Sequence, residues 1–294
     1  MLTDLFFKIN FSISIIASIF GLILSIITIF TISFERQLHS VTNLLTCNTS
    51  LAVGLYLIFS LIASIYGLNE KWSLNQPACQ FRAYIFVVSC TALLYSHSIH
   101  AISRLFFVIF HKYRYLLTWR IHWILVIISW VLGIFLPIEP FFFNNGYIYE
   151  NESRLCTCTT KTTLTATYII ITAFIIPFNI VTIIYSLLIC HAHKSTRRVR
   201  PIQSNIIVPP NIGREIILIR NMTILLFILL GGGIPYLILV IWNGIKINNP
   251  PEYLYLLIIN SITICTALMM LLLFTLNKDL KKKTYNFFKK FYLN

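Results

Sequence analysis

Seven long hydrophobic runs follow one another along the chain, and a short polar segment separates each run from the next. Each run is at least as long as the roughly 20 predominantly apolar residues that a helix needs to cross a hydrocarbon layer about 30 Å thick. We therefore predict an all-α membrane protein, a seven-transmembrane helix bundle formed by residues 1–276. The predicted spans cover residues 11–33, 41–66, 78–110, 122–143, 164–190, 216–242 and 253–276.

The last segment, residues 277–294, is basic and has a different pattern. At helical spacing one face would carry apolar residues while lysines occupy the others, which is typical of a helix lying in the inner membrane interface. A solvated basic tail is the alternative interpretation. The positions on the shared face are Leu280, Thr284, Phe287 and Phe291.

Composition and charge distribution support a membrane protein and assign its orientation. Hydrophobic residues make up 57% of the chain and charged residues only 11%, too few to cover a soluble fold. If the N-terminus is extracellular, the inner segments and the tail carry the whole net charge of +14, and the charges of the outer segments cancel. Positive inner loops then predict an extracellular N-terminus and a cytoplasmic C-terminus. This distribution explains the basic chain without nucleic acid as a partner.

The sequence has no recognisable catalytic or metal-binding motif. There is no HExxH motif, no phosphate-binding loop and no pair of CxxC motifs among the seven cysteines. We therefore expect neither enzymatic activity nor a metal or other cofactor. Two Asn-x-Ser sequons, at Asn10 and Asn151, fall on the predicted outer side and are candidate N-glycosylation positions.

The third predicted span carries unusual polar residues. Twenty-five residues separate Cys79 from Arg104, about 37 Å along a helix, so the two residues can lie at opposite membrane faces. Two histidines, His97 and His100, lie between these ends and share one helical face with Arg104. Because ionisable side chains at membrane depth normally face the protein interior, we expect this helix to be central in the bundle.

Several single residues in this chain stand at defined spacings from Cys79 or at defined places in the later spans. Trp72 precedes Cys79 by seven residues, and Arg104 follows it by 25. The remaining positions are Trp130, Pro177, Tyr185, Glu215 and Pro235. In this order, the positions resemble the motifs of the rhodopsin-like G-protein-coupled receptors over nearly the whole chain. The resemblance implies a plasma-membrane receptor that transduces an extracellular ligand signal to a heterotrimeric G protein.

Other family motifs are altered, which indicates a divergent member. Ser103 and Leu105 replace the acid and the tyrosine that usually flank the arginine, and Val53 replaces the sodium-binding aspartate. Gly232-Gly233-Ile234 precedes Pro235 where the family has Cys-Trp-x, and residues 269–273 lack the Asn-Pro-x-x-Tyr motif. A seven-span transporter or channel, or a non-signalling membrane scaffold, therefore remains an alternative function.

The resemblance implies two linked features of a receptor. Cys79 should form a disulfide with an outer-loop cysteine, either Cys156 or Cys158. At the inner face, Arg104 and Glu215 should form an ion pair between the third and sixth spans. The proposed activation switch and G-protein coupling residues are Arg104, Glu215, Tyr185 and Pro235.

The same analogy suggests a ligand pocket at the outer ends of the third and fourth spans. Phe86 stands where amine receptors carry an aspartate, so we do not expect a biogenic amine as ligand; the ligand itself is not identified. The candidate pocket residues are Arg82, Phe86, Ser89, Cys90 and Glu139.

His97 and His100 replace residues that are usually apolar in the family. Two interpretations are open. They are either hydrogen-bonded interior histidines or a proton-sensitive pair that biases two packings of the bundle.

Overall fold

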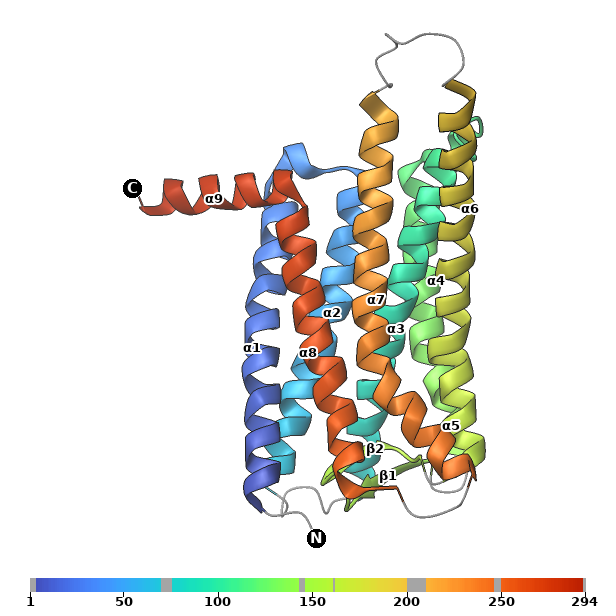
Figure 1. Cartoon of the computed structure of the whole chain (residues 1–294). Helices are drawn as coiled ribbons and strands as arrows, with labels where there is room; N and C mark the ends of the chain where they lie inside the picture. The colour runs from blue at the N-terminus through green and yellow to red at the C-terminus, as the bar shows by residue number, and fades with distance from the viewer. Residues whose placement is uncertain are drawn as a thin grey trace.

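Seven helices long and apolar enough to cross a membrane form an elongated bundle in the computed structural model (Figure 1). The structure describes residues 4–69, 76–142, 146–160, 162–199, 210–245 and 250–292. Within these residues the predicted fold class is confirmed. The spanning elements are α1 (Asp4–Phe34), α2 (Val41–Leu68), α3 (Gln76–Val108), α4 (Trp119–Phe135), the continuous segment of α5 (Thr163–Ile169), η5 (Ile170–Ile175) and α6 (Ile176–Val199), α7 (Pro210–Ile245) and α8 (Glu252–Leu276).

Shorter elements close the two ends of the bundle. At one end of the bundle, called the inner end here, α9 projects sideways away from the helices. An antiparallel hairpin of two strands covers the opposite end, called the outer end (Figure 1). Three single-turn or short 3-10 segments connect the helices. The short elements are η1 (Arg36–Leu38), η3 (Arg114–Leu117), η4 (Leu136–Phe142), β1 (Tyr147–Glu150), β2 (Leu155–Cys158) and α9 (Lys278–Tyr292).

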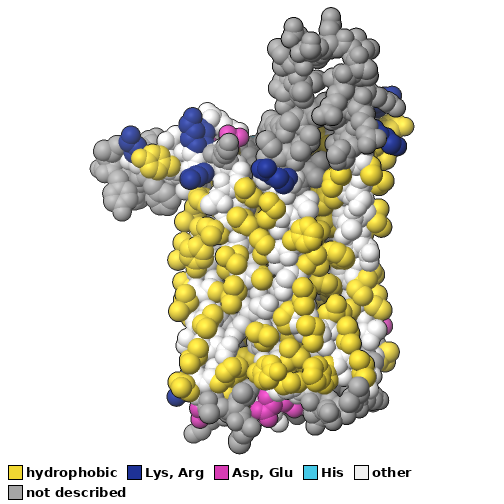
Figure 2. Space-filling model, viewed as in Figure 1, with side chains coloured by type: hydrophobic (Ala, Val, Ile, Leu, Met, Phe, Trp, Pro, Cys, Tyr) yellow, Lys and Arg dark blue, Asp and Glu magenta, His cyan; other side chains and the backbone are white. Residues whose placement is uncertain are grey.

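The side chains on the visible bundle wall are mainly hydrophobic (Figure 2). Figure 2 shows hydrophobic side chains along the height of the wall, with most of the visible Lys and Arg at the end that carries α9 and most of the visible Asp and Glu at the other end. Such a surface is unfavourable in water and suits a lipid environment. The chain is therefore a seven-span membrane protein.

The central position predicted for the third span is confirmed. In its most apolar window, 72% of α3 is buried, whereas the corresponding value for α1, α4 and α7 is 28%. α3 packs against α2, α4, α6 and both strands of the outer hairpin. Its residues from Thr91 to Ala101 are buried on every side. One helix thus joins the outer and inner ends of the molecule.

The fourth candidate span, Trp119–Phe142, lies close to its predicted extent of 122–143, but only part of it is α-helical. Its α-helix begins at Trp119 and ends at Phe135, and the chain continues as the 3-10 segment η4. Pro137 and Pro140 lie in that segment, and neither can donate a backbone hydrogen bond to an α-helix. The prolines therefore end the α-helix at Phe135, and the span continues to Phe142 as η4.

α7 is continuous through Pro235 and bends in its outer half (Figure 1). A proline inside a helix removes one backbone hydrogen bond, which accounts for a bend at this place. Gly232 permits close packing nearby: a Cβ there would lie 3.0 Å from Cβ of Cys265 on α8. Pro235 therefore bends α7 near the position where Gly232 allows α7 to pack closely against α8.

The outer hairpin, β1 and β2, was not predicted from the sequence. Its register pairs Tyr147 with Cys158 and Tyr149 with Cys156. Arg154, in the connecting turn, has a φ of 56°, in the left-handed region. Both strands end in buried residues, so the hairpin packs into the outer end of the bundle.

α9 is anchored to the inner end of the bundle by its first turns. Leu280 is fully buried with Ile32 and Leu38, and the Thr284 and Thr31 hydroxyl oxygens lie 3.1 Å apart. Lys283 forms an ion pair with Glu35 at 3.2 Å. The side chains of Phe287 and Phe291 lie outside the described residues, so an interfacial location of this helix stays a prediction.

Candidate functional site

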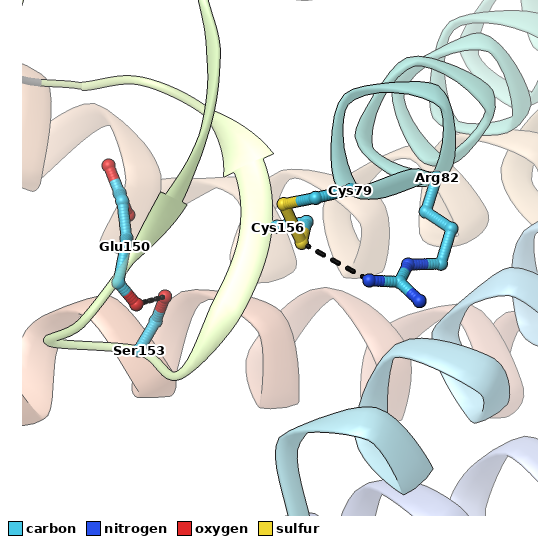
Figure 3. Close-up of a disulfide and its surroundings, with 5 residues drawn as sticks. All are labelled: Cys79, Arg82, Glu150, Ser153 and Cys156. Carbon is cyan, nitrogen blue, oxygen red and sulfur yellow. Dashed lines mark hydrogen bonds between the residues drawn. A yellow bond between two sulfur atoms is a disulfide. The ribbon is translucent and has the colours of Figure 1, made fainter. Parts of the chain in front are cut away.

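The predicted disulfide is present and joins Cys79 to Cys156, with their Cα atoms 5.3 Å apart (Figure 3). The sequence left Cys156 and Cys158 as equal candidates. Cys158 instead lies opposite Tyr147 in the hairpin and packs with Ala83 and Ile169 as a buried thiol. Burial, with a smaller contribution from the Glu150 carboxylate, raises the pKa of the Cys158 thiol to about 12. Cys158 therefore has a packing role and little reactivity.

Arg82 lies one turn along α3 from this disulfide. Its guanidinium stacks over the ring of Tyr66 on α2, 3.9 Å from the ring centroid, in a cation–π contact. Its Nη2 atom also donates a hydrogen bond to Sγ of Cys156 at 3.6 Å (Figure 3). The disulfide and the α2–α3 contact together position the Arg82 side chain at the outer end of the bundle.

A small cavity adjoins Arg82 and the hairpin. Its volume is about 20 Å³, which is room for about one water molecule. Three elements line it: α2, α3 and the hairpin. The lining residues are Phe59, Ile62, Ala63, Tyr66, Arg82, Phe86, Arg154, Leu155 and Cys156.

The structure brings together two of the five predicted pocket residues, Arg82 and Phe86. Phe86 lies against Tyr56, with ring centroids 5.3 Å apart. Ser89 donates to the Phe86 carbonyl of its own helix at 2.7 Å, and Cys90 packs at the edge of the main core. Glu139 is exposed on η4. Neither Ser89, Cys90 nor Glu139 lines this cavity, because helical rotation and the early end of α4 direct them elsewhere.

Sequence reasoning missed Arg154 and Tyr66. Arg154 forms a 2.7 Å ion pair with Asp4, and its guanidinium lies 4.0 Å from the centroid of the Phe7 ring. The hairpin thereby contacts the first turn of α1. No local signal predicts this pair, because its members are 150 residues apart in sequence.

The two predicted glycosylation positions differ in the structure. Asn10 lies within α1, where its amide nitrogen donates to the Phe6 carbonyl at 2.8 Å and its oxygen accepts from Asn260 at 2.6 Å. That engagement argues against Asn10 as a glycan acceptor. Asn151 is exposed in the turn of the hairpin, and its modification stays a prediction.

At the inner end of α3, Arg104 is buried, with 5% of its surface exposed. Tyr185 on α6 is equally buried and packs with Ala101 and Leu188. Glu215 belongs to α7, but its side chain lies outside the described residues. The ion pair between Arg104 and Glu215 therefore stays a prediction.

Ser103 makes a contact that the sequence did not reveal. Its hydroxyl lies 2.9 Å from Nε2 of His122 on α4, while Nδ1 of that ring lies 2.9 Å from the Thr118 carbonyl. A carbonyl can only accept, so Nδ1 carries a proton; in the neutral tautomer with this proton, Nε2 accepts from the Ser103 hydroxyl. His122 is fully buried. This Ser103–His122 bond links α3 to α4 beside Arg104.

His97 and His100 are both buried in the middle of the bundle. Nε2 of His97 lies 3.0 Å from the Met269 sulfur on α8, and the two histidine rings are 6.5 Å apart. Among the described residues, no three His, Cys, Asp or Glu side chains gather as a metal site requires. Both interpretations of the pair, as interior histidines or as a proton-sensitive element, stay open.

Comparison with known proteins places this geometry among membrane receptors. A family model described as 7 transmembrane receptor (rhodopsin family) matches residues 25–277. The chain is 30% identical over 187 residues to a Gq-coupled rhodopsin of Mizuhopecten yessoensis, covering 59% of this chain and 36% of the relative. It is 23% identical over 154 residues to 5-hydroxytryptamine receptor 5A of Rattus norvegicus, covering 52% and 42%. The chain thus matches less than half the length of these two relatives.

A solved structure supports the fold independently. The crystal structure of squid rhodopsin superposes with a TM-score of 0.79 at 15% sequence identity, and the match covers 98% of this chain and 87% of that one. At this identity the likeness concerns the arrangement of the helices. It does not specify the ligand or the signalling partner of this chain.

Proposed function

The chain belongs to the rhodopsin family of 7 transmembrane receptors, and we propose that it transduces an extracellular ligand signal to a heterotrimeric G protein. The observation that carries this proposal is the construction of α3. The helix is joined by a disulfide to the outer hairpin at Cys79 and holds a buried arginine, Arg104, at its other end. A rearrangement of the hairpin can therefore reach the inner end through one packed element.

The proposed location is the plasma membrane, with the N-terminus extracellular and the C-terminus cytoplasmic. The concentration of Lys and Arg at the end that carries α9 supports this orientation (Figure 2). The hairpin and the Arg82 cavity then face the outside, where a ligand arrives. Arg104 and the Ser103–His122 bond face the cytoplasm, where a G protein binds.

The proposed switch consists of Arg104, Glu215, Tyr185 and Pro235. An ion pair from α3 to α7 would hold the inner ends together, and its loss would let α7 move outward about the bend at Pro235. Tyr185 already packs beside Ala101 on α3. A ligand that favours the open arrangement would shift the population towards it.

Agonist-free nucleotide release from a panel of G proteins tests the proposal. The purified protein is placed in nanodiscs as wild type, Arg104→Ala, Glu215→Ala and the control Arg114→Ala, which removes an exposed cation from η3. We expect Glu215→Ala to raise exchange, Arg104→Ala to abolish it, and the control to match wild type. If neither wild type nor Glu215→Ala promotes exchange on any G protein, the proposed coupling is wrong.

A further inference from the structure

Arg82 is a cation whose charge no carboxylate of the described residues balances. In that part of the chain it forms no ion pair, and its contacts are the Tyr66 ring and the Cys156 sulfur. A guanidinium offers five N–H donors, and a disulfide sulfur is a weak acceptor. Most of the donor capacity of Arg82 is therefore directed at no strong acceptor of the protein.

The acid of strand β1 accepts hydrogen bonds from Thr160. Glu150 is buried, and its Oε1 accepts hydrogen bonds from the backbone nitrogen and the hydroxyl of Thr160 at 3.3 and 3.4 Å. Figure 3 shows Glu150 across the hairpin from the disulfide and Arg82. Its carboxylate belongs to the internal structure of the hairpin.

The second cation at the cavity, Arg154, forms an ion pair with an exposed acid. Its partner Asp4 has 76% of its side chain exposed, and ion pairs in such positions contribute little and are screened by salt. Arg154 thus adds a second guanidinium to the cavity lining beside Arg82. The remaining lining is mainly apolar, with Phe59, Ile62 and Phe86 facing it.

We infer that this cavity binds the acidic head group, a carboxylate or a phosphate, of a ligand with an apolar body, and that Arg82 is the residue that pairs with that head. The planar fork of a guanidinium matches both groups in a bidentate arrangement. The inference rests on the proposed function, because it treats the cavity as the entrance for the receptor's ligand. It also agrees with the expectation, drawn from Phe86, that the ligand is not an amine. Arg82 and Arg154 would repel the positive charge of an amine.

The size of the cavity predicts how the ligand acts. A volume of about 20 Å³ does not hold an apolar body, so binding has to separate α2, α3 and the hairpin. The head group would replace the Cys156 sulfur as the acceptor for Arg82. Since Cys156 is bonded to Cys79, this exchange alters the outer end of α3 directly.

The test uses the full chain in phosphatidylcholine nanodiscs. There are two series of probes, a dodecyl series and a phenyl series, and the members of each series share one apolar body. Dodecanoate and dodecyl phosphate carry acidic heads, dodecanol is the neutral control and dodecyltrimethylammonium the cationic one. Phenylacetate and phenyl phosphate are water-soluble acids of the same head chemistry. Binding is measured by calorimetry and by the shift in melting temperature, with empty nanodiscs subtracted to remove partition into lipid.

We expect at least one acidic series to bind roughly tenfold or more tightly than dodecanol, and the cation to bind no better than dodecanol. Arg82→Gln should remove this preference, whereas Arg82→Lys should keep it at reduced affinity because it retains the charge and loses the fork. The matched control Arg114→Gln, on exposed η3, should leave it unchanged. Equal binding of acidic and neutral probes, or an unchanged preference in Arg82→Gln, overturns the inference.

The two acidic series distinguish the source of the head group. Preference for the dodecyl acids indicates a lipid-like ligand, and preference for the phenyl acids indicates a water-soluble one. Nucleotide exchange on a G protein is recorded separately. Head-group selectivity without exchange supports the site and contradicts the proposed signalling, while agonist-free exchange without selectivity supports signalling and contradicts the site.

Discussion

The two ends of α3 are held in contrasting ways. At the outer end a covalent bond fixes Cys79 to the hairpin. Among the described residues, the partners of the neighbouring Arg82 are a ring and a sulfur. At the inner end no covalent bond is present among the described residues, and a single hydrogen bond joins Ser103 to His122 beside the buried Arg104. The outer end is thus fixed in position with a charge left to recognise a ligand. The inner end is held by contacts weak enough to be exchanged for a protein partner.

The largest effect should come from removing the outer bond. Cys79→Ser or Cys156→Ser removes a disulfide between residues that are 77 positions apart in sequence. Either substitution should lower the free energy of unfolding by about 2–5 kcal/mol. Thermal unfolding of the purified protein in nanodiscs measures this loss. Cys190→Ser, at an exposed free cysteine, is the matched control and should behave as wild type. Equal stability of all the variants would remove the contrast between the two ends.

A smaller loss is expected at the contact between α7 and α8, through which the two ends can also communicate. Gly232→Ala would place a Cβ 3.0 Å from Cβ of Cys265 and 3.2 Å from Cα of Ile262, so the helices have to separate at a cost of about 1–3 kcal/mol. At Gly231 nothing lies within 4 Å of the added atom. Gly231→Ala should therefore be neutral or stabilising by up to about 1 kcal/mol. Melting temperatures of the pair decide this, and an equal response would contradict close packing at Gly232.

The inner hydrogen bond should contribute less to stability than the disulfide and more to activity. Ser103→Ala leaves buried Nε2 of His122 without its donor, which costs about 1–3 kcal/mol. Because the bond fixes α3 beside Arg104, we also expect agonist-free nucleotide exchange to rise. A double-mutant cycle with His122→Phe should show that the two changes are not additive. Ser186→Ala, at an exposed position of α6, is the control; additive effects in the cycle would show that the contact has no energetic weight.

The smallest effect should follow Asp4→Asn. Its ion pair with Arg154 is mostly exposed, so the melting temperature should stay within the measurement error at physiological salt. The same substitution removes the Asp4 charge from Arg154 and should slightly strengthen binding of the acidic probes at low salt. A clear loss of stability would show that the contact between α1 and the hairpin matters more than its exposure indicates.

The sequence predicted the parts of the fold that the bilayer imposes. Seven apolar runs of sufficient length can only be membrane helices, because every backbone polar group in lipid has to be bonded within its own segment. The central position of α3 followed from the cost of placing His97, His100 and Arg104 against lipid. The existence of the disulfide followed from the family motif around Cys79.

Contacts between distant segments were decided by the tertiary structure alone. Cys156 and Cys158 are two residues apart on one strand, and only the pairing of β2 with β1 and its packing on α3 selects Cys156. Tyr66 meets Arg82, and His122 meets Ser103, because helix packing brings particular faces together. Hydropathy specifies which residues leave water, since transfer free energy is a property of each side chain. It does not specify which buried polar groups become partners, because that depends on rotation and register between elements far apart in the chain.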